Sequence, residues 1–129
     1  MLILPPSVRV YVASRPVDMR CGHDGLMAIV QDVWALDPYT GHLFAFVGMR
    51  RDRMKLLYFD RGGFVLVYKR LEKGRFKLPV VKSDAVSVEL EGGELAMLFD
   101  GIDVSRVRRP ARWTPPASIK GPIDPSLRP

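Results

Sequence analysis

GHLFAFVGMRRDRMKLLYFDRGGFVLVYKR, residues 41–70, contains three apolar runs that are separated by two short polar breaks. The runs cover residues 43–47, 54–60 and 64–71. Short runs rich in aromatic and β-branched side chains are typical of buried strands. The second break holds two glycines, which supply the positive φ angles that a tight hairpin needs. The stretch therefore predicts an antiparallel meander of three strands.

A strand and a helix are predicted before this meander. Residues 8–12 alternate valine with other residues, which is the period of a strand with one buried face. Within residues 24–36, four apolar side chains recur at i, i+3, i+4 and i+7 and form one face of an amphipathic helix. They are Leu26, Ile29, Val30 and Val33. Asp24 is positioned to cap this helix, and Pro38 begins the turn that ends it.

Further elements are predicted after the meander. Residues 76–80 and 86–90 show a period of two and predict two edge strands. Residues 94–101 carry apolar side chains at helical spacing, with Gly101 placed to end the helix in a left-handed cap. The predicted fold is α+β: an antiparallel, twisted sheet of five or six strands, packed by the helix of residues 24–36. The short second helix lies near the C-terminal end.

One domain is expected for a chain of 129 residues, since a single core usually spans roughly 100–150 residues. We place it at residues 1–104. Residues 105–129 hold six prolines and six basic residues, so we expect an extended or disordered basic tail. Cys21 is the sole cysteine, which fits a reducing compartment. No run reaches the roughly 20 apolar residues of a membrane span, and we expect a soluble, cytoplasmic protein with no membrane partner.

Charge is distributed unevenly along the chain. The net charge is +6, but it is −1 over residues 1–49, +8 over residues 50–82, −6 over residues 83–104 and +5 over residues 105–129. A polyanion such as DNA would meet the basic blocks first, through Coulomb attraction and counterion release. The alternative is that these lysines and arginines only solvate strand edges and the tail.

Two basic clusters adjoin the strands of the meander. The connections after residues 47 and 70 lie at one end of the sheet, because the hairpin turn between them lies at the other. We therefore predict a single basic patch that binds nucleic acid. Its residues are Arg50, Arg51, Arg53, Lys55, Lys69, Arg70, Lys73, Arg75 and Lys77. Exposed aromatic residues such as Tyr58, Tyr68 or Phe76 would add stacking, unless they fill the core instead.

No catalytic, metal or cofactor site is predicted. Five residues are the only candidates for a metal or acid–base cluster, but their spacing is no ligand signature, and turn or cap roles explain three of them. They are Asp18, His23, Asp24, His42 and Asp60. Cys21 and the dispersed serines lack a neighbouring base, so covalent catalysis is not expected either.

The order of short motifs along the chain resembles a known family. The first blocks are Asp18-Met19-Arg20 with Gly22, Asp24-Gly25-Leu26, Gly41-His42-Leu43-Phe44 with Phe46, Gly48 and Arg50-Arg51. The later blocks are Lys55-Leu56-Leu57 with Asp60 and Gly62, Lys69-Arg70-Leu71-Glu72, Gly74-Arg75-Phe76 with Pro79, Leu95, Met97-Leu98 and Gly101-Ile102-Asp103. Over about residues 5–104 they resemble the transposase accessory family called TnpB or Orf2-like, from IS66-type bacterial insertion sequences. Cys21, His23 and Tyr58-Phe59 depart from the family pattern.

The resemblance implies an accessory role. Members of the family accompany a separate, larger transposase of the same element and are needed for efficient transposition. We expect this chain to assist transposition by binding DNA or the transposase–DNA complex through the basic patch, without catalysing strand transfer. The alternative is a protein–protein adaptor that docks the transposase through its acidic segment, residues 83–104, with no direct role at DNA.

Deletion of the residues after Pro110 should leave the melting temperature nearly unchanged. A segment this rich in proline and charge buries too little apolar surface to offset the entropy of ordering it. Thermal melts of the full and truncated chains, followed by circular dichroism, measure the difference. A large decrease would show that Trp113 or Ile119 packs against the domain.

Overall fold

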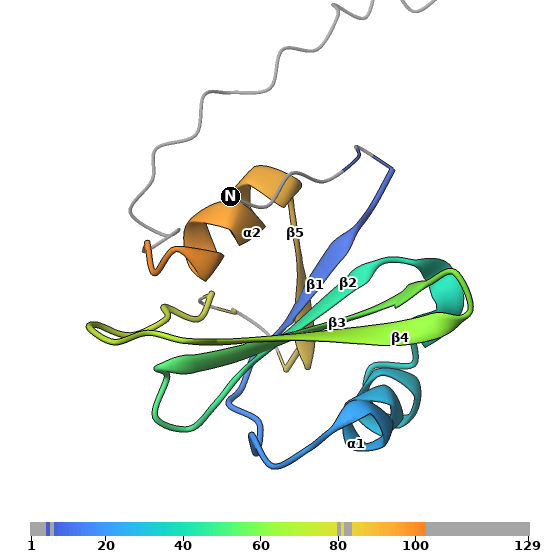
Figure 1. The fold of residues 1–129 in the computed structure, drawn as a ribbon, viewed down its shortest axis with the longest axis horizontal. Coiled ribbons are helices and arrows are strands. Elements are labelled where there is room, and N and C mark those ends of the chain that lie inside the picture. The colour runs from blue at the N-terminus through green and yellow to red at the C-terminus, as the bar shows by residue number, and fades with distance from the viewer. Residues whose placement is uncertain (1–4, 6, 80, 82–83, 103–129) are drawn as a thin grey trace, which may run out of the picture.

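The computed structural model describes residues 5, 7–79, 81 and 84–102, so the predicted tail at residues 105–129 lies outside the described residues. Five strands form one sheet in the order β4-β3-β2-β1-β5. They are β1 (Val10–Ala13), β2 (Leu43–Val47), β3 (Arg53–Asp60), β4 (Gly63–Arg70) and β5 (Ser87–Leu90). Helices α1 (His23–Ala28) and α2 (Gly92–Phe99) lie on opposite faces of this sheet (Figure 1). The α+β class is as predicted.

The sheet is mixed, which corrects the prediction of an antiparallel sheet. β1 pairs with β2 in parallel, with Val10 opposite Leu43, whereas the other three neighbouring pairs are antiparallel. The parallel direction results from the long connection between β1 and β2. Residues 14–42 carry the chain across one face of the sheet and back to the end where β1 begins, so β2 runs in the same direction. Parallel neighbours require such a long crossover, and a helix usually forms it.

The three-strand meander is confirmed. β3 lies between β2 and β4, and both pairings are antiparallel. Arg61 and Gly62 join β3 to β4 with φ angles of +45° and +86°, which is the left-handed backbone of a two-residue hairpin loop. The prediction of a strand within residues 86–90 is also confirmed, because β5 pairs with β1 at the edge of the sheet.

The strand predicted at residues 76–80 does not form over its described part, residues 76–79. The alternation there has a different cause, since Phe76 is fully buried in the core on the α2 side. Its N–H donates to the carbonyl of Arg51 at 2.6 Å, which anchors the segment to the loop after β2. Pro79 has no N–H to offer a ladder. Phe76 is therefore part of the core and is not exposed for stacking.

The helix that follows β1 changes pitch after Ala28. There α1 passes into a π-helix, η1 (Ile29–Val33), in which the N–H of Trp34 donates to the carbonyl of Ile29 at 3.0 Å. Because a π-helix bonds residue i to residue i+5, the side chain that follows Val30 on the buried face is Trp34. Trp34 is 8% exposed and stacks on Phe46, with 5.0 Å between ring centroids.

The predicted apolar face of this helix is therefore only partly correct. Leu26 and Val30 are buried and Ile29 is half-buried, but Val33 is 56% exposed. A wider turn rotates each later residue backward around the helix axis, which moves Val33 out of the interface. The sequence period of a regular α-helix does not reveal such a change of pitch.

The two helices begin in different ways. α1 has no side-chain hydrogen bond at its N-terminus, so the prediction that Asp24 caps it is wrong, and Asp24 lies in the first turn instead. α2 begins with a capping box formed by Glu91 and Glu94. At its C-terminal end Gly101 has a φ of +82°, as the predicted left-handed cap requires.

Apolar side chains on both faces of the sheet make up the core. Met54 and Leu56 belong to the cluster on the α2 side, and Leu57 belongs to the cluster on the α1 side. β2 is buried along its whole length because it lies between these clusters. No helix in the described part of the chain is long and apolar enough to cross a membrane. The short 3-10 helix η2 (Pro38–Thr40) packs beside β3.

Trp34→Ala should lower the free energy of unfolding by about 3–5 kcal/mol, because it leaves a cavity against Phe46. Val33→Ala, one residue earlier, should change it by less than about 0.5 kcal/mol, because that side chain is exposed. Urea denaturation of both variants measures the contrast. A larger loss of stability in Val33→Ala than in Trp34→Ala would show that a regular α-helix runs through residue 33.

Candidate nucleic-acid interface

The loop after β2 and the segment after β4 lie against each other at one end of the sheet. The N–H of Leu71 donates to the carbonyl of Asp52 at 2.7 Å, and the N–H of Phe76 donates to the carbonyl of Arg51. Figure 1 shows both segments at the end opposite the β3–β4 hairpin turn. We call the surface made by residues 49–53 and 70–77 the basic end. The structure thus brings the two predicted basic clusters together, as the meander argument required.

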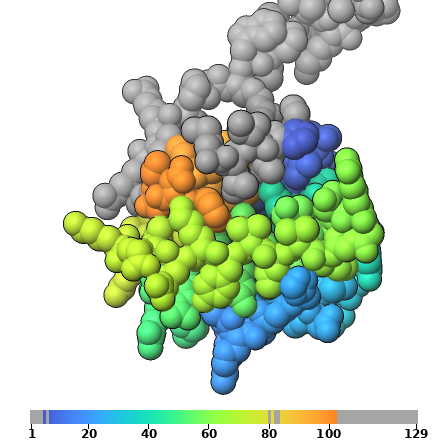
Figure 2. Space-filling view, viewed as in Figure 1, coloured from blue at the N-terminus to red at the C-terminus, as the bar shows by residue number. Residues whose placement is uncertain are grey.

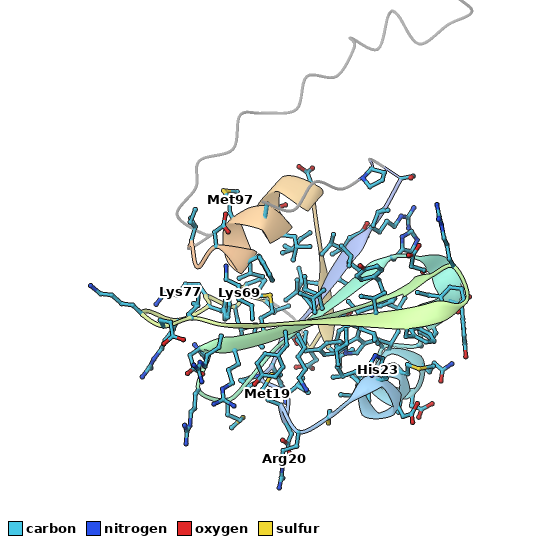
Figure 3. The ribbon with its side chains drawn as sticks, in the orientation of Figure 1. Met19, Arg20, His23, Lys69, Lys77 and Met97 are labelled. Carbon is cyan, nitrogen blue, oxygen red and sulfur yellow. The ribbon has the colours of Figure 1, made fainter. Side chains whose placement is uncertain are left out.

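Five predicted cations at the basic end are exposed and have no ion pair or side-chain hydrogen bond within the described part of the chain. They are Arg50, Arg51, Lys73, Arg75 and Lys77. Arg50 and Arg75, one from each cluster, line the same open hollow of about 410 Å³. Lys77 is labelled at the basic end in Figure 3. The side chains of the segment after β4 project from the surface in Figure 2.

The charge in the hollows around the loop at residues 48–52 is mixed. Asp52 lines two of them, and its Oδ1 is buried without a hydrogen-bond partner among the described residues, as is Nε of Arg53. The excess positive charge is therefore carried by projecting side chains, in an arrangement that suits contacts with a polyanion better than enclosure of a small ligand.

Arg53 and Arg70 lie opposite each other on β3 and β4, at the border of the basic end. Arg53 Nη1 donates to the hydroxyl of Tyr68 at 3.2 Å. Arg70 pairs with Glu72 at 3.0 Å, and this hydrogen bond raises the pKa of the Arg70 guanidinium. Glu72 is itself largely exposed, and such surface pairs are weak. Arg70 is therefore held only weakly by Glu72.

Lys55 lies in the interior rather than on the predicted patch. Its side chain is 7% exposed, and its Nζ donates to the carbonyls of Met19 at 2.7 Å and Cys21 at 2.8 Å. The ammonium also lies 5.1 Å from the centre of the Tyr68 ring. A buried ammonium held in this way cannot reach a phosphate, so we leave Lys55 out of the interface.

Lys69 is also used within the fold. It points to the α2 side of the sheet, where Nζ donates to the carbonyl of Phe99 at 2.6 Å and lies 3.8 Å from Asp100 (Figure 3). The ammonium also sits 4.4 Å from the Phe99 ring centre. A cation is stabilised at the C-terminal end of a helix. Lys69 thus fastens the end of α2 to β4, which leaves it less free than its neighbours to bind a ligand.

The loop before α1 also reaches the basic end, which sequence reasoning missed. Val17 bridges to Gly48, and Asp18 lines a hollow of about 550 Å³ with Arg50 and Arg53. Hydrogen bonds from the Arg20 side chain and backbone N–H lower the pKa of Asp18 to about 2. Asp18 therefore stays ionised at neutral pH. The Asp18-Met19-Arg20 motif marked this loop in the sequence. The motif lies about 30 residues before Gly48, so local patterns could not predict that the two loops are in contact.

Of the three aromatic residues proposed for stacking, Tyr68 is the accessible one. It is 47% exposed, whereas Tyr58 packs against the core and Phe76 is buried. A second missed feature is Met49, which is 75% exposed in the loop beside Arg50. No group of three His, Cys, Asp or Glu side chains within the described ranges could hold a metal ion.

Comparison with known proteins identifies the family. Residues 8–109 match the family model described as IS66 Orf2 like protein. The chain belongs to this family. The uncharacterized protein y4jC of Sinorhizobium fredii is 41% identical over 102 residues, which cover 79% of this chain and 86% of that protein. The uncharacterized protein y4hO of the same organism is 38% identical over 103 residues, 80% of this chain and 88% of that protein. No solved structure matches the chain.

Membership in the IS66 Orf2-like family confirms the resemblance drawn from the motifs and supports an accessory role in an insertion sequence. The structure shows what several motif residues do. Lys55 holds the carbonyl of Met19, and a Cβ placed on Gly48 would lie 2.5 Å from Cγ of Met19. Three separate motif blocks therefore meet in one packing contact beside the basic end.

Lys55→Met should lower the free energy of unfolding by about 2–3 kcal/mol, because two backbone carbonyls lose their charged donor. Lys77→Met, which removes an exposed ammonium, should change it by less than about 0.5 kcal/mol. Chemical denaturation of both variants measures this. Equal stability of the two variants would contradict the interior role of Lys55.

Proposed function

We propose that this IS66 Orf2-like protein assists transposition by binding duplex DNA at its basic end. The observation that carries the proposal is the meeting of the two clusters. Arg50 and Arg75 are far apart in sequence but line one hollow, and three further exposed cations of the basic end have no ion pair with any described residue. In a folded domain, such a group of projecting guanidinium and ammonium groups attracts the phosphates of a polyanion.

The chemistry of the basic end favours contacts with the DNA backbone. Its five cations without a partner among the described residues sit in the loop at residues 48–52 and the segment at residues 71–79, and neither segment is a helix or strand that would enter a groove. Phosphate contacts of this kind position a protein on DNA without reading its sequence. If all five reach phosphates, the logarithm of affinity should fall with the logarithm of salt concentration with a slope of roughly −4.5.

The same proposal accounts for an accessory role beside a transposase. A protein that binds the DNA backbone is able to stabilise a transposase–DNA complex without recognising the sequence of the element's ends. The transposase would supply the sequence recognition and the chemistry, and this chain would add neutralising contacts. Association with the transposase of the same element is part of this proposal.

The adaptor alternative has less support from the structure. Of the acidic residues in the 83–104 segment, Glu94 is buried in the capping box of α2, and Asp100 faces Lys69. Asp103 lies outside the described residues. Glu91 is the other member of that capping box. Because these three carboxylates serve the local structure of α2, fewer remain to form a docking surface for a basic transposase.

Replacement of Arg50, Arg51, Lys73 and Arg75 by glutamine should weaken binding to duplex DNA. The slope of log affinity against log salt should flatten by roughly 0.9 for each phosphate that the variant can no longer reach. The melting temperature should change little, because exposed charges contribute little to stability. Fluorescence anisotropy with a labelled duplex, titrated at several salt concentrations, measures affinity and slope together.

A pair of arginines at the other end of the sheet provides a control of equal charge. Arg9 precedes β1 and Arg61 lies in the hairpin turn, and both are exposed. Changing these two to glutamine should alter the slope less than changing Arg50 and Arg75. An equal change of slope in the two double variants would show that DNA binding depends only on the net charge of the protein. Intact affinity in the fourfold variant, with transposase association abolished when the exposed Asp84 and Glu89 are neutralised, would support the adaptor instead.

A further inference from the structure

The two edges of the sheet differ in a way that matters for association. β5 is four residues long and carries the exposed charge of Glu89. Shortness and charge are the usual means by which an edge strand avoids pairing with another chain. β4, at the opposite edge, is eight residues long and has a neighbouring strand on one side only within the described residues.

The outer side of β4 presents a regular row of backbone groups that pair with no strand in the described part of the chain. Its register with β3 is continuous from Asp60 opposite Gly63 to Arg53 opposite Arg70, without a bulge. In an antiparallel ladder after a two-residue turn, alternate residues bond inward. Residues 63, 65, 67 and 69 therefore bond to β3, and the N–H and C=O groups of residues 64, 66, 68 and 70 point outward.

The side chains of β4 do not protect this edge over most of its length. Residues 64–68 read Phe-Val-Leu-Val-Tyr, and the first four are half-exposed. The strand contains no proline, and its charges, Lys69 and Arg70, lie together at one end. An apolar, regular edge of this length favours the addition of another strand.

We propose that a second copy of this chain pairs with β4 in antiparallel orientation, so that the two sheets become one continuous sheet. The two cations at one end of β4 favour the antiparallel direction, which separates the Lys69-Arg70 pairs of the two copies. A parallel copy would place Lys69 and Arg70 beside the same two cations. With Leu66 opposite Leu66 of the partner subunit, the two Arg70 residues lie eight residues apart, about 27 Å, which is beyond the Debye length at physiological salt.

This register also matches the side chains across the new pair of strands. The outward-facing residues are even-numbered, so only even residues can exchange hydrogen bonds with one another. Tyr68 then lies opposite Phe64 of the partner subunit, an aromatic pair of the kind that stabilises neighbouring strands. Lys69 lies opposite Gly63 of the partner subunit, which leaves room for its side chain.

The proposed dimer leaves the basic end free. β4 runs toward the basic end, so antiparallel pairing directs the basic ends of the two copies to opposite ends of the new pair of strands. Self-association and DNA binding are therefore separable, and the dimer does not depend on the proposed function. Because an edge contact buries a small area, we expect a dimer that dissociates on dilution.

Charge swapping at Leu66 tests the proposal. Sedimentation equilibrium of the wild-type chain should show twice the mass of one chain at high concentration and dissociation on dilution. Leu66→Lys alone and Leu66→Glu alone should each stay monomeric, because like charges face each other across the two-fold axis. An equimolar mixture of the two variants should recover the dimer. Val33→Lys and Val33→Glu, exposed on η1, should dimerise like the wild type.

A cysteine variant keeps the test decisive if a charged variant fails to fold. In a Cys21→Ser background, Leu66→Cys places two thiols at a separation that a disulfide can bridge, and oxidation should give a cross-linked dimer. Val33→Cys in the same background should give little cross-linked dimer. A wild-type chain that stays monomeric at every concentration would overturn the proposal. So would a dimer that persists in Leu66→Lys, or equal cross-linking of the two cysteine variants.

Discussion

The parallel pairing of β1 with β2 is the constraint on which the rest of the structure depends. It requires residues 14–42 to cross one face of the sheet, and this crossover carries α1 and η1 into contact with β2. It also leaves the outer side of β1 for β5, so the meander can grow only in the other direction, away from β1. As a result β4 becomes the other edge strand, and the antiparallel pairing of β2, β3 and β4 brings the loop after β2 and the segment after β4 to one end.

Residues of one chemical type serve two different purposes in this protein. Lys55 and Lys69 hold backbone carbonyls of the 18–22 loop and of α2, and both are thereby part of the packing. Arg50, Arg75 and Lys77 project from connecting segments, and their charges have no partner in the part of the chain that the structure describes. The difference follows from the face of the strand on which each lysine lies and from the elements that cover that face. A lysine on a covered face must find acceptors in the interior, because an unpaired buried charge is costly. A cation in a loop remains in water.

The motifs that relate the chain to the IS66 Orf2-like family therefore carry two kinds of information. Met19, Gly48 and Lys55 make one packing contact, which fixes the loop before α1 against the end of β2. Arg50 and Arg75 are held on this scaffold at the basic end. These three motif residues are thus required by the fold, and the surface proposed to bind DNA depends on that scaffold for its geometry.

The sequence by itself determined the α+β class, the meander of β2, β3 and β4, the turn at Gly62 and the left-handed cap at Gly101, because each depends on local periodicity or local backbone preference. It also placed the two basic clusters at one end, since alternating strand direction requires this. Only the tertiary structure decided the parallel direction of β2 and the burial of Phe76 and Lys55. It also decided the π-helical turn, which buries Trp34 and leaves Val33 exposed. Each of these depends on which distant element covers the residue, and the period of a single segment carries no record of that contact.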